Sequence, residues 1–490
     1  NKEIHKMHPP ETVLMRTKLA FGIGASGEAG TLWMFNALTF FFYNQVLGLP
    51  PDLAGYAVAI AIVFDAITDP VMGSISDRFR SKYGRRHPFM FAAPGPILIA
   101  LFFIFNPPGS VESNFQLFAW YTFFTIMLRV SLTLFTVPHL ALGAELSDDY
   151  DERSKVMSYN TLFGYVGVVF MHVFVWFIIF DNFEGGQRNI EAYTPIVIYA
   201  SVLIAICILV SAWFTKDQIP FLKKPPDDGE RIGFIRLVKD MKGAMSNKNY
   251  LNLLIGLFFL SVLIGTHETL GLYMVTFFWE LTPYQIGFLI INNIIGYALG
   301  FILAARLHRR FDKRATIVFT CLTLSIFWSS AVTLRLFDLA PLNTTWELVI
   351  FIICLGSISS ASGSILHISV MSALADVADE NELKTGMRQE GIYYSARAFF
   401  GKASNAFGHV VAGLALKYIG FPENAIPGEL SSDMIFNLGI IDGPFAMVWG
   451  FIAVFFYYRY GINRKYHAQI QEQLRLKKSA QNSSNQPESV

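Results

Sequence analysis

Long apolar runs separated by short polar breaks dominate the chain. Runs bounded by charged or Pro/Gly-rich positions give twelve segments of about 20 residues or more, enough to cross a hydrocarbon core of about 30 Å as helices. Several exceed 25 residues, so we expect them to tilt, kink or extend beyond the bilayer. The expected spans are 18–46, 53–76, 88–106, 115–145, 154–180, 194–214, 250–279, 284–306, 315–337, 346–376, 389–418 and 436–460.

The longest polar interruption follows the sixth span and divides the spans into two groups of six. A weak repeat supports two related halves, because the polar stretches at 73–86 and 300–314 both begin with glycine and carry clustered arginines. Two related halves around a midplane site are typical of secondary transporters. The predicted divisions are an N-terminal six-helix bundle at 1–214, a cytoplasmic linker at 215–249, a C-terminal six-helix bundle at 250–462 and a cytoplasmic polar tail at 463–490.

Positive charge is distributed unevenly between the two ends of the spans. Of the 38 Lys and Arg residues, 32 lie in the two tails and in the loops on the same side as the tails. The opposite side holds only Arg188, Arg335 and Lys417. Because cytoplasmic loops are enriched in Lys and Arg, we expect a multi-pass protein of the cell (inner) membrane with both termini in the cytoplasm.

Composition excludes several classes of function. The 490 residues are 53% hydrophobic and only 15% charged, against about 25% charged in a soluble protein. The net charge of +1 comes from dispersed residues, so no nucleic-acid partner is expected. Cys207, Cys321 and Cys354 lie in apolar runs and suggest neither a disulfide nor a zinc site. No HExxH or GxSxG motif supports a membrane-embedded enzyme, so we predict a carrier.

Two acidic residues lie within the second span. Asp65 and Asp69 are four residues apart, which places both carboxylates on one helix face. They are expected to share a proton or to bind a cation together with further oxygens, from Thr68 or Thr136. Alternatively, Asp69 only precedes a helix break at Pro70 and Asp65 faces a cytoplasmic vestibule. Intramembrane carboxylates are costly, which favours the functional interpretation.

Basic residues within the spans suggest two further interpretations. Arg129 forms a polar stripe with Thr133 and Thr136 on span 4, and Arg397 lies on span 11. Both arginines are candidates to bind an anionic group of a substrate through bidentate hydrogen bonds. The alternative is that they pair with acids of other spans, namely Glu28 of span 1 and Glu268 of span 7. His267, beside that second acid, is more simply explained by a local hydrogen bond.

A charged loop follows the second span. It carries Asp77, Arg78, Arg85 and Arg86, and Glu145 lies at the same end of span 4. We expect these residues to form ion pairs that close the cytoplasmic side in the outward-facing state. The alternative is that the arginines only set the topology.

Two motifs resemble those of one transporter family. The segment 65–73, continuing through 77–78 to 84–88, resembles the glycoside-pentoside-hexuronide:cation symporters, the melibiose-carrier branch of the major facilitator superfamily. A second match lies between spans 10 and 11, where Asp376, Asp379 and Arg388 are expected at the cytoplasmic gate. The likeness extends over all twelve spans.

The resemblance implies a fold and a mechanism. It implies an all-α major facilitator fold and alternating access, with sodium-, lithium- or proton-coupled symport of a sugar, glycoside or sugar acid. Asp65 and Asp69 are then cation ligands, and Lys402 aligns with a lysine beside that site. We expect Lys402 to neutralise the aspartates when the cation is absent. The expected partners are a small-molecule substrate and membrane lipid, with a monomer as the functional form and no cofactor beyond the coupling cation.

Departures from the family pattern leave the substrate open. The sugar-binding residues of the melibiose carrier align here with other residue types: Ala29, Glu28, Thr136, Leu140 and Thr161. The melibiose-type clamp is therefore absent, and Glu28 is a candidate to replace its acid, with Thr161 at a further substrate position. The same scaffold carries lysophospholipids in an animal branch, so the alternative function is cation-coupled transport of a lysophospholipid or other amphiphile.

Overall fold

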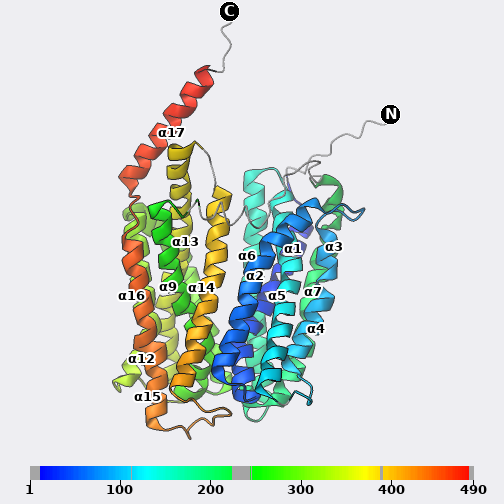
Figure 1. The fold of residues 1–490 in the computed structure, drawn as a ribbon, viewed down its shortest axis with the longest axis vertical. Coiled ribbons are helices and arrows are strands. Elements are labelled where there is room, and N and C mark those ends of the chain that lie inside the picture. Colours follow the sequence, from blue (N-terminus) through cyan, green and yellow to red (C-terminus); the bar gives the residue numbers. More distant parts are fainter. Residues whose placement is uncertain (1–11, 112, 223–242, 244, 387–389, 485–490) are drawn as a thin grey trace, which may run out of the picture. The chain divides into compact units, whose positions relative to one another are not determined.

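The protein is built from helices. The computed structural model describes residues 12–111, 113–222, 243, 245–386 and 390–484, and every regular element in these ranges is helical. Ten helical segments of this described part have the length and mean hydropathy to cross a membrane. Two further long helices, which are more polar, occupy the predicted positions of spans 1 and 11; they are α1 and α14. The all-α prediction is therefore confirmed (Figure 1).

The first half of the chain contributes six long helical segments. Short π-helical or 3-10 turns extend several of them. Three short 3-10 turns connect the fifth segment to the sixth. The elements are α1 (Met15–Phe41) with η1 (Phe42–Val46), α2 (Pro51–Arg78), α3 (His87–Ala92) with α4 (Pro94–Phe105), α5 (Asn114–Glu145), α6 (Tyr150–Val173) with η2 (Phe174–Ile179) and η3 (Phe180–Asn182), η4 (Gly186–Arg188), η5 (Ile190–Ala192), and α7 (Tyr193–Thr215) with η6 (Lys216–Phe221).

The second half contributes six long segments and a terminal helix. Here too π-helical turns interrupt two of the spans. The elements are α9 (Lys248–Tyr273) with η7 (Met274–Phe278), α10 (Pro283–Phe288) with α11 (Ile290–Arg310), α12 (Lys313–Leu336), α13 (Trp346–Thr385), α14 (Glu390–Tyr418), α15 (Ser432–Ile440) with η8 (Ile441–Phe445) and α16 (Ala446–Tyr458), and α17 (Arg464–Ser484).

Local sequence signals explain where helices begin, bend and end. Ser113 and Gln116 form a reciprocal capping box at the start of α5, which satisfies two backbone N–H groups that would lack helical partners. Pro70 and Pro138 lie inside α2 and α5, and each removes a backbone hydrogen bond and frees a carbonyl one turn earlier. Gly386 ends α13 with φ +73°, a conformation that suits glycine.

The described residues form two compact units. Unit 1 comprises 1–232, 268–288 and 409–435, and unit 2 comprises 233–267, 289–408 and 436–490. The division between the units therefore falls within α9 and within α14, so unit 1 includes residues from both halves of the sequence. The predicted division at 1–214 and 250–462 follows chain order instead and remains a prediction.

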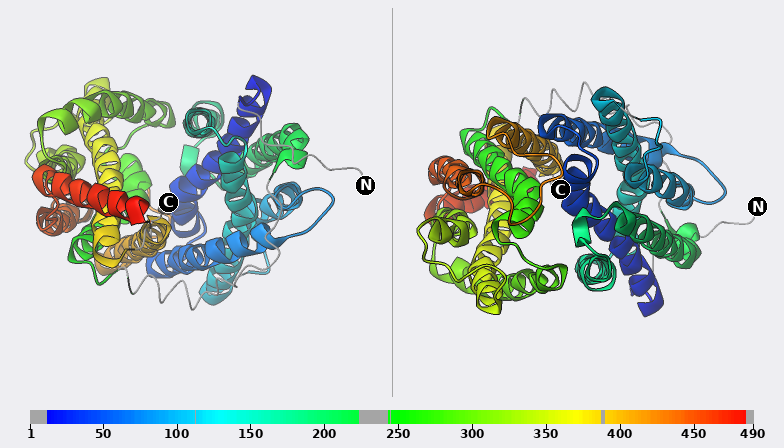
Figure 2. Two further views of the ribbon diagram at one scale, coloured as in Figure 1. Left: turned by 90° about the horizontal axis from the view of Figure 1, so that it is seen from above. Right: turned by 90° about the horizontal axis from the view of Figure 1, so that it is seen from below.

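Close helix contacts through small residues hold unit 1 together. Helix α1, dark blue in the end-on views of Figure 2, packs along α6 and α7. A Cβ atom at Gly167 of α6 would lie 2.4 Å from the backbone oxygen of Ser26 of α1. Small residues are what allow two helix backbones to approach this closely in a membrane protein.

Unit 2 has its own apolar core and its own close contacts. Helix α13 packs against α11 and α12, and a Cβ atom at Gly296 of α11 would lie 2.4 Å from the Cβ of Ser360. The core is formed largely by α9, α12, α13, α14 and α16 and includes the buried Tyr250 and Tyr457. Helix α17 adds the buried Ile470 to this core.

Two polar stretches that hydropathy places outside the spans are helical. Span 10 was expected to end at 376, but α13 continues to Thr385. The predicted polar tail forms α17, which contacts α13. Most of the predicted linker, 223–242 and 244, lies outside the described residues.

Candidate functional site

The two aspartates of span 2 lie beside a hydroxyl group of span 4. The Oγ1 of Thr133 lies 3.1 Å from Oδ1 of Asp65 and 2.9 Å from Oδ1 of Asp69. A hydroxyl carries one proton, so it donates to one carboxylate at a time. Asp65 is 6% exposed and Thr133 is 3% exposed, whereas Asp69 is half-buried. The arrangement therefore offers a cation three oxygen-bearing side chains.

An arginine lies against one of the two carboxylates. The Nη1 of Arg129, one turn before Thr133, lies 3.5 Å from Oδ2 of Asp65. Its Nη2 donates to Oδ1 of Asn36 at 3.4 Å, and the guanidinium lies 4.5 Å from the ring centre of Phe35. The Nε atom is buried and has no hydrogen-bond partner within the described residues. Two ionised aspartates with one arginine, counted without Glu268, carry a net charge of −1, which one monovalent cation would neutralise.

Two residues from the second half of the sequence belong to the same unit. The carboxylates that act electrostatically on Arg129 include Glu268 as well as the two aspartates. The Nε2 of His409 lies 3.9 Å from Oε2 of Glu268, and its Nδ1 lies 2.6 Å from Oγ1 of Thr269. The side chain of Glu268 is 34% exposed, so it can meet a solute from water while His409 stays buried.

Other predicted site residues of unit 1 lie elsewhere on the same helices. Thr136, predicted as a cation ligand, is half-buried on α5. Thr133, three residues earlier on the same helix, contacts both aspartates. Glu28 is half-buried on α1. Thr161 is exposed on α6 and donates to the backbone oxygen of Met157 at 3.1 Å.

The two predicted basic residues of span 11 belong to unit 2. Arg397 and Lys402 are both half-buried on α14. The groups that act electrostatically on Arg397 include the hydroxyls of Tyr457, Tyr250 and Tyr394. Within the described residues of unit 2 no carboxylate forms an ion pair with Arg397, and its Nε is buried without a partner. The acids predicted as its partners, Glu28 and Glu268, belong to unit 1, so this pairing stays a prediction.

The predicted gate residues of unit 1 form a connected ion-pair cluster. One oxygen of Glu145 lies 2.8 Å from a nitrogen of Arg85 and 2.8 Å from a nitrogen of Arg86. Arg86 also lies 2.5 Å from Asp77 and donates to Oγ of Ser76 at 2.7 Å. The cluster joins the end of α2 to α3 and α5. The remaining predicted member, Arg78, is half-buried at the end of α2.

A second charged cluster lies at one end of unit 2. The ammonium group of Lys313 contacts both oxygens of Asp376, at 2.6 and 2.8 Å. The Nε2 of His467, on α17, lies 3.4 Å from Asp376 and 3.2 Å from Asp379. Ligand atoms of these three residues lie within 4.8 Å of one another, close enough to hold a metal ion. The ammonium group of Lys313 already provides a cation there. Arg388, the other predicted gate residue of this motif, lies outside the described residues.

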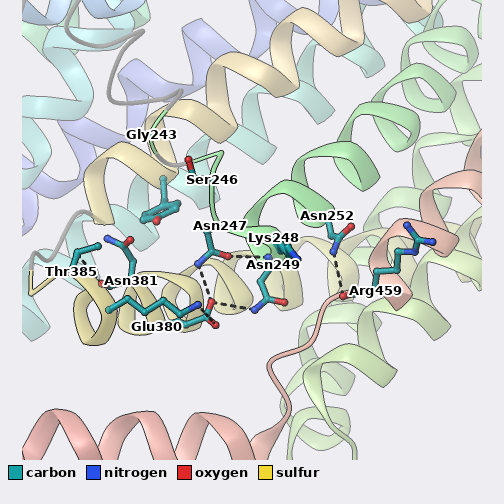
Figure 3. A pocket seen from close by; sticks show the side chains of 12 residues that line it. Gly243, Ser246, Asn247, Lys248, Asn249, Asn252, Glu380, Asn381, Thr385 and Arg459 are labelled. Carbon is teal, nitrogen blue, oxygen red and sulfur yellow. Dashed lines mark hydrogen bonds and ion pairs between the residues drawn. The ribbon is translucent and has the colours of Figure 1, made fainter.

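A polar cavity opens beside this cluster in unit 2 (Figure 3). Its volume is about 710 Å³. On its wall, Glu380 accepts hydrogen bonds from Asn247 at 2.9 Å, Asn249 at 3.1 Å and Lys384 at 2.8 Å. The lining residues are Gly243, Ser246, Asn247, Lys248, Asn249, Asn252, Glu380, Asn381, Lys384, Thr385, Tyr393 and Arg459.

The other end of unit 1 is held by contacts between the two halves of the sequence. Lys417 lies 2.6 Å from Oδ2 of Asp52, at the opposite end of α2 from Asp77. Gln45 donates to the backbone oxygen of Pro422 at 3.0 Å and accepts from the backbone N–H of Ala425 at 3.0 Å. These contacts fix the end of α14 and its following loop against the beginning of α2.

Sequence reasoning missed one buried acid. Asp442 lies in η8, inside an apolar segment, and its Oδ1 is 2.6 Å from Nδ1 of His267. Its signal was present, because it is the only acidic residue within the predicted span 436–460. The sequence interpretation favoured a local hydrogen bond for His267 over a place in the cavity lining. The structure instead pairs it with a carboxylate from a different helix.

Comparisons with known proteins agree with this architecture. The family described as MFS/sugar transport protein matches residues 20–464. An uncharacterized symporter of Synechocystis sp. is 25% identical, covering 95% of this chain and 98% of that protein. A putative glycoside/cation symporter of Escherichia coli is 22% identical, covering 83% and 84%. A sphingosine-1-phosphate transporter of Mus musculus is 23% identical, covering 87% and 85%.

A solved structure supports the fold. The crystal structure of the nucleoside transporter NupG superimposes with a TM-score of 0.61 at 13% identity, covering 91% of this chain and 100% of that one. The predicted major facilitator fold and the predicted family resemblance are therefore confirmed. The protein is a multi-pass membrane transporter and not an enzyme, and its symporter relatives imply a small-molecule substrate and a coupling cation. The chain belongs to the MFS/sugar transport protein family.

Proposed function

We propose that this protein is a cation-coupled symporter whose cation binds at Asp65, Asp69 and Thr133. The observation that carries the proposal is the contact of one hydroxyl with both carboxylates, at 3.1 and 2.9 Å. Carboxylate and hydroxyl oxygens are ligands that suit hard cations. The net charge of −1 on this group with Arg129 supports a monovalent ion, either Na⁺, Li⁺ or H⁺. Thr136, three residues after Thr133 on α5, is a further candidate ligand.

Release of Arg129 by the arriving cation would couple the two binding events. Without a cation, the guanidinium of Arg129 lies 3.5 Å from Asp65. A cation between the carboxylates weakens the attraction on the guanidinium, which then becomes available for a solute. By thermodynamic linkage, the factor by which the cation strengthens solute binding equals the factor by which the solute strengthens cation binding. Lys402 is proposed to act on the same equilibrium.

The substrate is proposed to be a sugar, glycoside or sugar acid. The name of the Escherichia coli relative, a putative glycoside/cation symporter, supports this class. Glu268 is exposed enough to accept hydrogen bonds from solute hydroxyls, and Glu28, Thr161 and Arg397 are proposed as further solute contacts. Transport of a lysophospholipid or similar amphiphile is the second candidate, because one relative is a sphingosine-1-phosphate transporter.

Alternating access is proposed to use the charged clusters at the ends of the units. The contacts of Gln45 and the Lys417–Asp52 pair support a closed external end. The cytoplasmic gate is proposed to comprise Arg78, Arg388 and the two clusters around Glu145 and Asp376. We place the protein in the inner membrane as a monomer surrounded by lipid, with both termini in the cytoplasm.

Thermal unfolding of the purified protein tests the proposal. Na⁺ at about 100 times its dissociation constant should stabilise the folded state by about 2.7 kcal/mol, relative to choline at equal ionic strength. Asp69→Asn should lose this stabilisation. Neutral glycosides, uronates and lysophospholipids are then compared with and without Na⁺. A lysolipid that stabilises while no sugar does would contradict the sugar assignment, and equal unfolding in Na⁺, Li⁺ and choline at every pH would contradict cation coupling.

A further inference from the structure

A buried histidine and a buried aspartate from different helices contact each other in unit 2. His267 of α9 and Asp442 of η8 approach to 2.6 Å between Nδ1 and Oδ1. Their side chains are 5% and 7% exposed. The Nε2 of His267 and the Oδ1 of Asp442 are both buried and have no hydrogen-bond partner within the described part of the chain, so the contact is a close approach and not an aligned hydrogen bond. The pair is therefore removed from water and has few other groups to solvate it.

Charge balance limits the protonation states of this pair. A neutral imidazole beside an ionised carboxylate would leave one buried negative charge, and an imidazolium beside a carboxylic acid would leave one positive charge. Both states are costly at low dielectric. Imidazolium with carboxylate, or imidazole with carboxylic acid, is neutral overall. The two neutral states hold the same number of protons and differ only in whether the exchangeable proton is on the imidazole or on the carboxylate. The buried pair is therefore a site for one exchangeable proton.

An aromatic ring covers one face of the imidazole. The ring of Trp328 stacks on His267 with centroids 4.7 Å apart and an interplanar angle of 5°, and an indole face attracts a cation. On α12 the ionisable side chains nearest to Trp328 in sequence are Cys321 and Arg335, each seven residues away, or about 10 Å along the axis. Helix α16 has ionisable side chains only in its last two residues.

Two neighbouring helices supply the remaining charged groups. A Cβ atom at Gly265 of α9 would lie 2.5 Å from the backbone oxygen of Asn405, so α14 packs at this level. The ionisable residue of α14 nearest in sequence to that contact is Lys402. The next residue of α9, Glu268, faces His409 in unit 1. These two charged residues therefore have to be tested beside the pair itself.

His267 lies at a boundary between the two units, and Asp442 lies in a π-helical turn between two α-helices. His267 is the last residue of α9 that belongs to unit 2, and the helix continues into unit 1 at Glu268. Asp442 lies in a π-helical turn with Gly443 and Pro444, and such turns are frequent at functional sites. We propose that His267 and Asp442 form a second ion site, separate from the aspartate pair of unit 1, which takes up one proton and returns it to water when these segments rearrange. Only the rearrangement rests on the proposed transport function.

Fluorescence of Trp328 provides a direct measurement of this proton. An imidazolium in contact with an indole quenches its emission more strongly than a neutral imidazole does. Emission of the full-length protein in detergent is recorded from pH 5 to 10, and the signal of Trp328→Phe is subtracted. We expect one single-proton step with brighter emission at high pH. The step should be lost in His267→Gln, and in Asp442→Asn it should move to lower pH by one unit or more.

Matched variants separate this site from other groups. His139→Gln removes a histidine that is also buried but whose Nε2 contacts the backbone oxygen of Phe21 at 2.9 Å, and the step should remain. It should also remain in Asp69→Asn and in Glu268→Gln, while Lys402→Met should shift it without removing it. Asp442→Glu keeps the charge and serves if Asp442→Asn does not fold.

Two outcomes overturn the proposal. A flat profile from pH 5 to 10 in the folded wild-type protein means that the pair neither takes up nor releases a proton in this range. A step that survives His267→Gln belongs to another group. Stabilisation by Na⁺ is a separate measurement that depends on Asp69, so loss of the cation-coupled function and loss of the proton site give different results.

Discussion

Replacing Thr133 by valine tests the cation site most directly. Valine has nearly the same shape, so the substitution removes the hydroxyl and leaves the packing of α5 against α2 almost unchanged. The hydroxyl makes its contacts to Asp65 and Asp69 at 3.1 and 2.9 Å. A hydrogen bond to a charged group contributes about 1.5–3 kcal/mol, and the same oxygen is lost as a cation ligand. We therefore expect about a 10- to 100-fold weaker affinity for Na⁺.

The assay is a titration of thermal stability with NaCl at constant ionic strength. The midpoint of the stabilisation gives the dissociation constant for Na⁺ in the wild-type protein and in each variant. Thr136→Val is the matched control, because it removes the same hydroxyl three residues further along α5. Its side chain is half-buried, and we expect its affinity for Na⁺ to change by less than about threefold.

The two variants distinguish Thr133, the cation ligand indicated by the contacts, from Thr136, the ligand predicted from the sequence. If Thr136→Val weakens Na⁺ binding while Thr133→Val does not, the ligand predicted from sequence is right and the contact geometry does not describe the bound state. If neither variant changes the affinity, the ion does not bind between these carboxylates. Serine at 133 should restore most of the affinity, because it keeps the hydroxyl.

Further predictions concern the ends and the packing of the units. Gln45→Ala removes the hydrogen bonds of this side chain to Asn44, Pro422 and Ala425 and should lower the free energy of unfolding by about 2 kcal/mol in thermal unfolding. Arg86→Ala removes one of the two arginines that contact Glu145, together with the hydrogen bond to Ser76, and should cost about 2 kcal/mol. Lys465→Ala, exposed on α17, should stay within about 0.5 kcal/mol. Gly167→Ala should destabilise by about 1–3 kcal/mol because of its 2.4 Å approach to α1, and Gly271→Ala, with nothing within 4 Å, should not. Size-exclusion profiles of the purified variants check both predictions, because a destabilised variant loses its monodisperse peak.

The spans were predictable because membrane helices satisfy simple rules of length and polarity. Span 10 shows the limit of these rules: the polar residues after 376 were expected to end the helix, but α13 continues to a glycine cap at Gly386. Helix formation depends on backbone hydrogen bonding and capping, and polar residues do not interrupt it. Hydropathy therefore locates a span better than it locates the ends of its helix.

The site was predictable as a stripe but not as a set of contacts. The four-residue spacing placed Asp65 and Asp69 on one helix face, and the stripe on span 4 was also recognised. Which threonine of that stripe contacts the aspartates depends on the rotation of α5 about its axis. Pro138 lies five residues after Thr133 and alters the local backbone. Asp442 was missed because its partner His267 lies 175 residues away in the sequence, a separation that periodicity does not address.

The oxygen count of the aspartate site suggests how solute and cation depend on each other. Hard cations in proteins take about six oxygen ligands, and Asp65, Asp69 and Thr133 provide fewer than that even if both carboxylates bind through both oxygens. Water or solute hydroxyls must then complete the coordination. A solute hydroxyl in that position would raise the affinity for the cation directly, and the cation would raise the affinity for the solute by the same factor. A proton needs no such completion, because two carboxylates can share it. Strong mutual dependence of solute and Na⁺ binding, with weak dependence on solute in proton binding, is therefore the behaviour expected of this site.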